Sequence, residues 1–97
     1  MFFPIDPELL ATDGRLSDRC RRAYLVLTKK LDPIAYRPVK VGWVAFVLQI
    51  HRADASRALR TLVGCGYLDR NGQDDSGVFT YRFAPPNAPL ITPQRLT

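Results

Sequence analysis

The sequence contains little cysteine and histidine, and this scarcity excludes several kinds of site. Its two cysteines, Cys20 and Cys65, lie far apart, and His51 is its single histidine. Zinc sites are usually built from closely spaced cysteines and histidines, so this chain cannot form one without carboxylates, and no disulfide framework is indicated. We therefore expect two buried thiols in a reducing cytoplasm, with no metal and no cofactor.

The sequence also lacks a hydrophobic run long enough to cross a membrane. Its longest apolar segment, Val41 to Leu48, is far shorter than the roughly 20 residues of a spanning helix. The N-terminus has no basic region ahead of its apolar residues, so it does not resemble a secretion signal. These absences predict a soluble cytoplasmic protein without a membrane partner.

Catalytic side chains are equally scarce. His51 has no evident nucleophile with an orienting partner, the acidic residues show no paired spacing, and no glycine-rich phosphate loop is present. We therefore predict that the protein is not an enzyme, and no small-molecule substrate is evident.

Arginine, by contrast, is abundant. The 97-residue chain has a net charge of +5, and eleven of its fourteen basic residues are arginine. Guanidinium groups suit forked hydrogen bonds to phosphate or guanine, so this bias favours a polyanionic partner. A hydrophobic content of 46% indicates a single folded domain with one modest core.

An apolar arm is predicted over residues 1–16. It is too hydrophobic for a solvated tail, and its prolines break any long helix. With Asp6 as N-cap, Pro7 would open one or two helical turns through Ala11. The arm covers either its own domain or a partner subunit, and the sequence leaves both open.

A long helix is predicted from its N-cap Ser17 to about Leu31. Its core stripe consists of Leu16, Cys20, Tyr24, Leu27 and Leu31. The side chains expected to point outward are Arg19, Arg22, Lys29 and Lys30, and such charges usually form a solvated face. Residues 34–40, interrupted by Pro38, fit a brief edge strand or an extended connector.

Two helices separated by a tight turn are predicted next. Val41–Leu48 is almost entirely apolar, and periodicity alone does not distinguish a helix from a buried strand there. A second helix beginning near His51 makes a helix-turn-helix the economical interpretation, with Asp54 rather than His51 satisfying its first amides. Trp43 is expected to fill the gap between layers, and the expected buried positions are Val44, Phe46, Val47 and Leu48.

The second of these helices carries the strongest functional pattern. From Ala53 onward, apolar residues recur with the spacing of an amphipathic helix, at Ala55, Ala58, Leu59, Leu62 and Val63. The opposite face carries Arg52, Ser56, Arg57 and Arg60. Gly66 is expected to end the helix in a left-handed conformation. A short helix with a cationic outer face meets the requirements of a major-groove reader.

A β-hairpin is predicted after this helix, from the runs Tyr67 to Arg70 and Val78 to Phe83. The second run alternates, which places Phe79, Tyr81 and Phe83 on one face. Between the two runs, Asn71-Gly72 is the strongest local turn cue. The final residues, 85–97, contain four prolines and are predicted to be extended or disordered.

This order of elements resembles the winged helix-turn-helix family of bacterial and phage DNA-binding domains. The middle pattern of that family appears at Ala45, Ile50, Ser56-Arg57-Ala58-Leu59 and Leu62-Val63-Gly64-Cys65-Gly66-Tyr67-Leu68, and the likeness covers about Ser17 to Phe83. The resemblance implies an α+β fold with a three-helix core, a C-terminal β-hairpin wing and a short edge strand. It places the domain at residues 17–84, between the apolar arm and the proline-rich tail of residues 85–97.

The sequence departs from the family pattern at the turn, in the core and at the hairpin tip. Gln49 replaces the turn glycine at a position that often favours a left-handed residue, and Ala55 replaces a larger β-branched residue. The tip carries Asp74 and Asp75, whereas a wing that lies along phosphates is usually basic. The wing is therefore expected to stand off the DNA or to contact it near its base, through Arg70, Asn71 or Arg82.

The resemblance implies sequence-specific binding of double-stranded DNA, in the role of a transcriptional regulator. Arg52 and Arg57 are the candidates for hydrogen bonds to guanine. Ser56 and Arg60 are expected to hold phosphates. One short helix reads too few base pairs for useful affinity, so we expect a homodimer formed through the arm or the first long helix.

Two alternatives stay open at this point: a winged-helix module that binds protein, and an accessory protein of phage or plasmid replication. A continuous positive stripe across Arg52, Arg57 and Arg60 would favour DNA. Interruption of that stripe by Asp54 and Asp69 would favour a protein partner.

Overall fold

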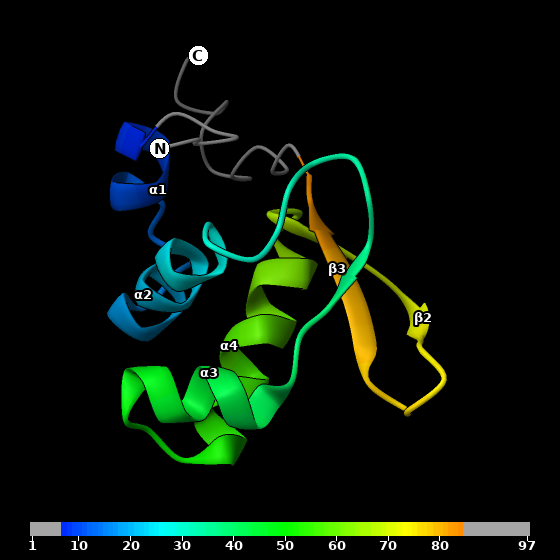
Figure 1. Ribbon diagram of the computed structural model, residues 1–97. Helices are drawn as coiled ribbons and strands as arrows, with labels where there is room; N and C mark the ends of the chain where they lie inside the picture. The colour runs from blue at the N-terminus through cyan, green and yellow to red at the C-terminus, as the bar shows by residue number, and fades with distance from the viewer. Residues whose placement is uncertain (1–6, 85–97) are drawn as a thin grey trace.

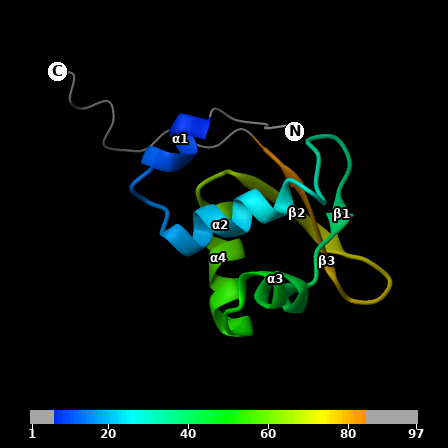
Figure 2. The same ribbon diagram turned by 60° about the vertical axis from the view of Figure 1, so that its left-hand side comes forward.

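The computed structural model describes residues 7–84, which form four helices and a three-stranded antiparallel sheet (Figure 1). In chain order the elements are α1 (Pro7–Thr12), α2 (Asp18–Leu27), β1 (Arg37–Pro38), α3 (Val41–Leu48), α4 (Arg52–Gly64), β2 (Leu68–Gln73) and β3 (Phe79–Phe83). The helices lie on one side and the sheet on the other, as Figure 2 shows from a second direction. This arrangement confirms the predicted α+β class. Within residues 7–84, every helix is too short or too polar to span a membrane.

The described part of the apolar arm packs against its own domain. Leu10 and Leu16 belong to the buried core. The Arg21 side chain on α2 donates to two backbone carbonyls of this segment, that of Leu10 at 3.0 Å and that of Asp13 at 2.8 Å. The expected N-cap Asp6 and the tail of residues 85–97 lie outside the described residues.

The buried carboxylate of Asp13 joins this segment to Tyr67, which follows α4. The Asp13 carboxylate accepts hydrogen bonds from the Tyr67 hydroxyl and from Arg15 Nη2, each at 2.7 Å. The hydrogen bonds from the Arg15 side chain hold the pKa of Asp13 well below its usual range, against the opposing effect of burial. Burial, together with the bond to Asp13, raises the pKa of Tyr67 to about 12. At neutral pH, Asp13 is therefore an anion and Tyr67 a neutral donor.

Helix α2 begins as predicted and ends at Leu27, earlier than the predicted Leu31. Ser17 is its N-cap, and the Ser17 side chain accepts from the backbone N–H of Cys20 at 3.2 Å. Beyond Leu27 the backbone forms hydrogen bonds between residues three apart, as in a 3₁₀ turn. The Thr28 hydroxyl donates a hydrogen bond to the Leu25 carbonyl at 2.6 Å. The predicted core stripe is confirmed, because all of its members are buried: Leu16, Cys20, Tyr24, Leu27 and Leu31.

Helices α3 and α4 are joined by a short turn, as predicted. Gln49 takes a left-handed conformation at the end of α3, with φ 57° and ψ 50°. The Ile50 N–H then bonds to the Ala45 carbonyl at 3.0 Å, which is the closure of a left-handed helix end. Glutamine thus occupies a conformation that glycine adopts at lower cost.

The expected burial of α3 is wrong at two positions. Val44 and Leu48 are buried, but Phe46 is 81% exposed and Val47 is 41% exposed. Helix α3 has eight residues and packs against α2 and α4 along one face, so among residues 7–84 no element covers its other face. Trp43 is half-buried, and its ring lies 4.4 Å from the Lys30 ammonium nitrogen.

The sheet has the strand order β1-β3-β2, so β1 is an edge strand, as Pro38 predicted. The predicted hairpin turn at Asn71-Gly72 is wrong. The turn lies at residues 74–77, where the Gly77 N–H bonds to the Asp74 carbonyl at 3.0 Å and Gly77 has a φ of 84°. Asn71 and Gly72 belong to β2, at an irregularity in its pairing with β3.

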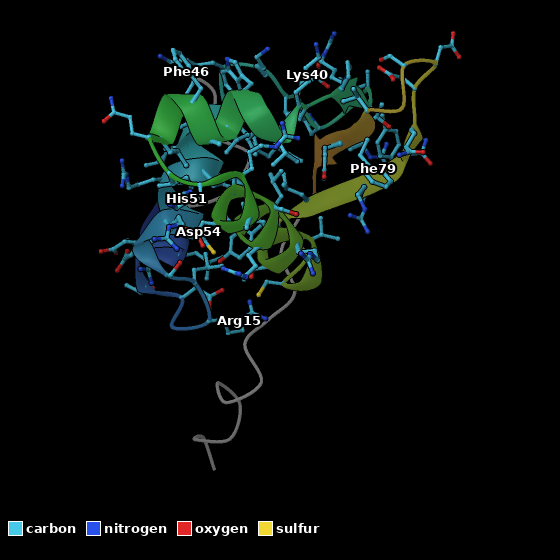
Figure 3. All side chains as sticks on the ribbon, turned by 90° about the horizontal axis from the view of Figure 1, so that it is seen from below. Arg15, Lys40, Phe46, His51, Asp54 and Phe79 are labelled. Carbon is cyan, nitrogen blue, oxygen red and sulfur yellow. The ribbon has the colours of Figure 1, made fainter. Side chains whose placement is uncertain are left out.

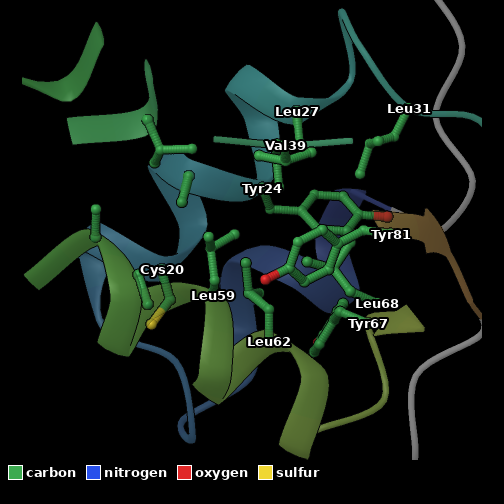
Figure 4. Packing of buried hydrophobic residues seen from close by; sticks show 14 of the residues in the cluster. Cys20, Tyr24, Leu27, Leu31, Val39, Leu59, Leu62, Tyr67, Leu68 and Tyr81 are labelled. Carbon is green, nitrogen blue, oxygen red and sulfur yellow. The ribbon is translucent and has the colours of Figure 1, made fainter. Parts of the chain in front are cut away.

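Aromatic rings fill the space between the helices and the sheet (Figure 4). The ring of Tyr24 lies 5.6 Å from that of Tyr67 and 5.0 Å from that of Phe83, centroid to centroid. Within residues 7–84, the buried Tyr24 hydroxyl has no hydrogen-bond partner. Tyr81 and Phe83 are buried as the alternation of β3 predicted, whereas Phe79 is partly exposed.

Candidate functional site

The exposed face of α4 carries the arginines that the sequence predicted. Its buried face consists of Ala55, Ala58, Leu59 and Leu62, while Val63 is half-buried. The opposite face presents Arg52, Arg57 and Arg60, which are exposed, and Ser56, which is half-buried. Gly66, with a φ of 85°, turns the chain out of the helix toward β2. One face of α4 thus packs on α2 and α3, and the cationic face is open to solvent.

The Asp54 carboxylate lies between two arginines near the start of α4, on the side shown in Figure 3. Its Oδ1 accepts from Arg57 Nη1 at 2.8 Å and lies 3.7 Å from Arg19 Nη1 of α2. The expected bonds from Asp54 to the first amides of α4 are therefore replaced by ion pairs. The Arg57 side chain is 67% exposed, and pairs of this kind contribute less than about 1 kcal/mol, so Arg57 can change partner easily.

Arg52 and Arg60 have no ion pair within residues 7–84, and they lie in different surroundings. A Cβ atom added to Gly42 would come within 3.4 Å of Arg52 Nη1, so the Arg52 guanidinium lies over the first turn of α3. Lys40, the exposed N-cap of α3, lies at the same end of that helix. Lys40 is not among the site residues predicted from the sequence, although it lies just ahead of a predicted helix. Arg60 extends from the middle of α4 into solvent.

The base of the hairpin presents a second group of predicted residues. The Arg70 guanidinium lies 4.7 Å from the centroid of the Phe79 ring, and Asn71 is exposed. Arg82 is occupied within the fold, because it lies 3.3 Å from Asp69 and over the Tyr36 ring. Arg70 and Asn71 are therefore more available to a ligand than Arg82.

The acidic hairpin tip is less acidic toward solvent than the sequence indicates. The Asp74 carboxylate turns inward and accepts from the backbone N–H groups of Ser76 at 2.9 Å and Val78 at 3.0 Å. The hydrogen bond from the Val78 backbone, followed by that from the Ser76 side chain, lowers the pKa of Asp74. Asp75 is the carboxylate that stays exposed at the tip.

Side chains of the metal-ligand type are scattered. In the part of the chain that the structure describes, no three histidine, cysteine or acidic side chains come close enough to hold a metal ion. Cys20 is a buried free thiol, and Cys65 is half-buried rather than fully buried as expected. Burial raises the pKa of the Cys65 thiol. His51 is exposed at the start of α4 and makes no side-chain capping bond.

Comparison with solved structures identifies a similar fold. The chain resembles a possible transcriptional regulator from Methanosarcina mazei Go1. The TM-score is 0.58, and the match covers 88% of this chain and 73% of that chain at 15% sequence identity. No family model and no curated protein matches the chain. At this level of identity the likeness concerns the fold, namely four helices and a three-stranded antiparallel sheet.

Proposed function

We propose that this chain is a winged helix-turn-helix transcriptional regulator that binds double-stranded DNA sequence-specifically. The observation that carries the proposal is the pairing of α3 and α4 around the left-handed Gln49, which leaves the arginine-bearing face of α4 open. A helix presented in this way fits the major groove. The fold shared with a possible transcriptional regulator supports the regulatory role.

In this docking the N-terminal half of α4 approaches the base edges. Arg57 releases its ion pair with Asp54 and forms two hydrogen bonds to guanine. Each such bidentate contact favours the correct base over a wrong one by about 1–3 kcal/mol. Arg52 is the second candidate for guanine, after turning away from Gly42. Ser56 and Arg60 hold phosphates, which fixes the register without reading sequence.

The hairpin serves as the wing and contacts the DNA backbone near its base. Arg70 and Asn71 are the residues proposed for this contact, because both are exposed there. The inward-turned Asp74 reduces the repulsion that two acidic residues at the tip would cause, and Asp75 keeps the tip away from phosphates.

A homodimer completes the proposal, because two copies of α4 read two half-sites. Residues 7–16 pack on their own domain, so the outer face of α2 is favoured over the described part of the arm as the interface. Light scattering at protein concentrations used for DNA binding tests this, and a monomer in the presence of a palindromic duplex would contradict it.

The test of DNA binding uses fluorescence anisotropy with labelled duplexes at two salt concentrations. Arg57→Ala should weaken specific binding most at one or two base positions. Arg60→Ala should weaken all sequences alike and reduce the salt slope by about 1. Lys29→Ala is the matched control, since it removes one exposed cation from the turn after α2, and it should change neither. Unchanged affinity in both α4 variants, with circular dichroism intact, refutes this docking.

A second candidate function, a module that binds protein, is favoured by two observations. Asp54 interrupts the positive stripe at Arg57, and Asp69 pairs with Arg82. Phe46 and Val47 are exposed apolar residues of α3, and Figure 3 shows Phe46 on that helix. If the folded protein does not bind duplex DNA at low salt, protein binding becomes the favoured function.

A further inference from the structure

A cleft of about 420 Å³ opens between the start of α3, the start of α4 and strand β3. Its volume falls within the range of about 300–1,000 Å³ that small-molecule sites occupy. Two cationic residues, Lys40 and Arg52, line it together with three aromatic residues, Trp43, Phe79 and Tyr81. Figure 3 shows Lys40 at the end of α3 that faces the hairpin and Phe79 on the hairpin itself.

The two cations are available to an anion. Within residues 7–84, neither Lys40 nor Arg52 forms an ion pair at salt-bridge distance, and Lys40 interacts with the Asp74 carboxylate only through longer-range electrostatics. Arg52 already lies across Gly42, whose missing side chain leaves room for the guanidinium. A planar guanidinium binds a carboxylate through two parallel hydrogen bonds, so Arg52 sets the orientation and Lys40 adds charge.

The rings of Trp43 and Phe79 favour a planar apolar group next to that anion. Trp43 and Phe79 each have a cation over the ring, Lys30 at 4.4 Å and Arg70 at 4.7 Å. Both rings line the cleft, and with Val78 and Tyr81 they form an apolar lining. An inorganic anion would leave this apolar surface exposed to water, whereas the ring of an aromatic carboxylate would bury it.

We propose that this cleft binds a small aromatic carboxylate, with its carboxylate on Arg52 and Lys40 and its ring against Trp43 and Phe79. The bound molecule would hold Arg52 over α3 and occupy the space between α4 and the hairpin. If the proposed DNA docking holds, on which this regulatory consequence rests, such a ligand weakens DNA binding, because Arg52 cannot serve both partners. Ligand binding itself does not depend on DNA.

Benzoate is the probe, and the fluorescence of Trp43 is the readout. Trp43 is the single tryptophan of the chain and lines the cleft, so its emission reports occupancy directly. We expect a saturable change with a Kd on the order of 1 mM or below. Arg52→Ala should weaken binding by about tenfold or more, since a charged hydrogen-bond pair is lost. Arg60→Ala removes the same charge from the same helix outside the cleft and should leave benzoate affinity unchanged.

Two further experiments distinguish the contribution of the ligand's ring from that of its charge. Acetate and inorganic phosphate carry an anion without a ring, and both should bind at least about tenfold more weakly than benzoate. Gly42→Leu keeps both cations and raises the helix propensity of this position, but its side chain fills the space under Arg52. This variant should therefore also abolish the fluorescence response to benzoate. Circular dichroism of each variant confirms that it folds.

Three results would overturn the proposal: no saturable response to benzoate in the wild type, equal benzoate affinity in Arg52→Ala, or acetate or phosphate binding as tightly as benzoate. The last result identifies a plain anion site of the kind that a DNA phosphate occupies. The effect on DNA binding is measured in a separate experiment. Saturating benzoate should lower the duplex affinity of the wild type and should not lower that of Arg52→Ala. Failure of DNA binding leaves the fluorescence titration interpretable, so the two proposals fail independently.

Discussion

The contact between Asp13 and Tyr67 predicts a large loss of stability in the variant Asp13→Asn. The asparagine keeps the shape of the side chain but removes the charge that accepts hydrogen bonds from Tyr67 and Arg15. One of its two terminal atoms becomes a donor and must face at least one of those two donors. The variant therefore removes the charge from, and at least one hydrogen bond of, the cluster that joins the arm to the residue following Gly66.

We expect Asp13→Asn to lower the free energy of unfolding by about 3 kcal/mol. Removing one partner of a buried charge pair costs about 3–5 kcal/mol, and the lower end applies here because the Arg15 side chain keeps 30% of its surface in water. For a domain of this size the loss lowers Tm by roughly 12–24 °C. Small domains are stable by about 5–15 kcal/mol, so the variant still folds at room temperature.

The same carboxylate also makes stability depend on pH. Its pKa in the folded protein lies well below the value of about 4 in an unfolded chain. Its stabilising effect is therefore complete above about pH 4 and is lost as the pH falls toward the folded pKa. Within that window the wild type loses about 1.4 kcal/mol per pH unit through this one proton. Asp13→Asn lacks this loss.

Urea denaturation followed by circular dichroism at about pH 7 and about pH 3 measures both effects. Asp18→Asn is the matched control, because the Asp18 side chain is 95% exposed and, within residues 7–84, pairs only with the nearby Arg21. The control should stay within about 1 kcal/mol of the wild type. Equal stability of the two variants at neutral pH, or the same acid sensitivity in Asp13→Asn and the wild type, would refute the stabilising role of the ionic contact.

Two other substitutions test the core and the turn. Tyr24→Phe removes a buried hydroxyl that has no partner within residues 7–84 and should raise the free energy of unfolding by about 1 kcal/mol; a lower urea midpoint would show that the hydroxyl is bonded in solution. Gln49→Gly relieves a left-handed backbone and should raise the free energy of unfolding by about 0.5–1 kcal/mol, whereas Gln49→Val should lower it by at least as much; an unchanged Tm in both would contradict the left-handed turn.

The elements that the sequence predicted correctly are those decided by residues close together in the chain. The start of α2 depends on Ser17 and the amide of Cys20, three residues on. The buried face of α4 follows from apolar residues that recur within two helical turns. Pro38 restricts its strand to an edge because it lacks an amide hydrogen, whatever the neighbouring strand contains.

The predictions that failed were decided by competition or by the absence of a neighbour. Asn71-Gly72 favours a turn, but residues 74–77 offer a stronger one, since the Asp74 carboxylate binds two backbone amides and Gly77 supplies the positive φ. Phe46 is apolar and helical, and whether it is buried depends on how many elements surround α3. Sequence periodicity contains no information about that number.

The arginines of α4 show the same division between local pattern and distant contact. A helical wheel places Arg52, Arg57 and Arg60 on one surface, and the structure keeps all three exposed. Their surroundings nevertheless differ, because Asp54 holds Arg57, Gly42 leaves room for Arg52 beside the cleft, and Arg60 has no ion pair within residues 7–84. A single positive stripe is therefore the wrong description of this face. A substitution at Arg60 therefore tests binding to a polyanion alone. A substitution at Arg57 tests whether its ion pair with Asp54 is replaced by a contact to a base, and one at Arg52 tests whether this side chain binds the DNA groove or a ligand in the cleft.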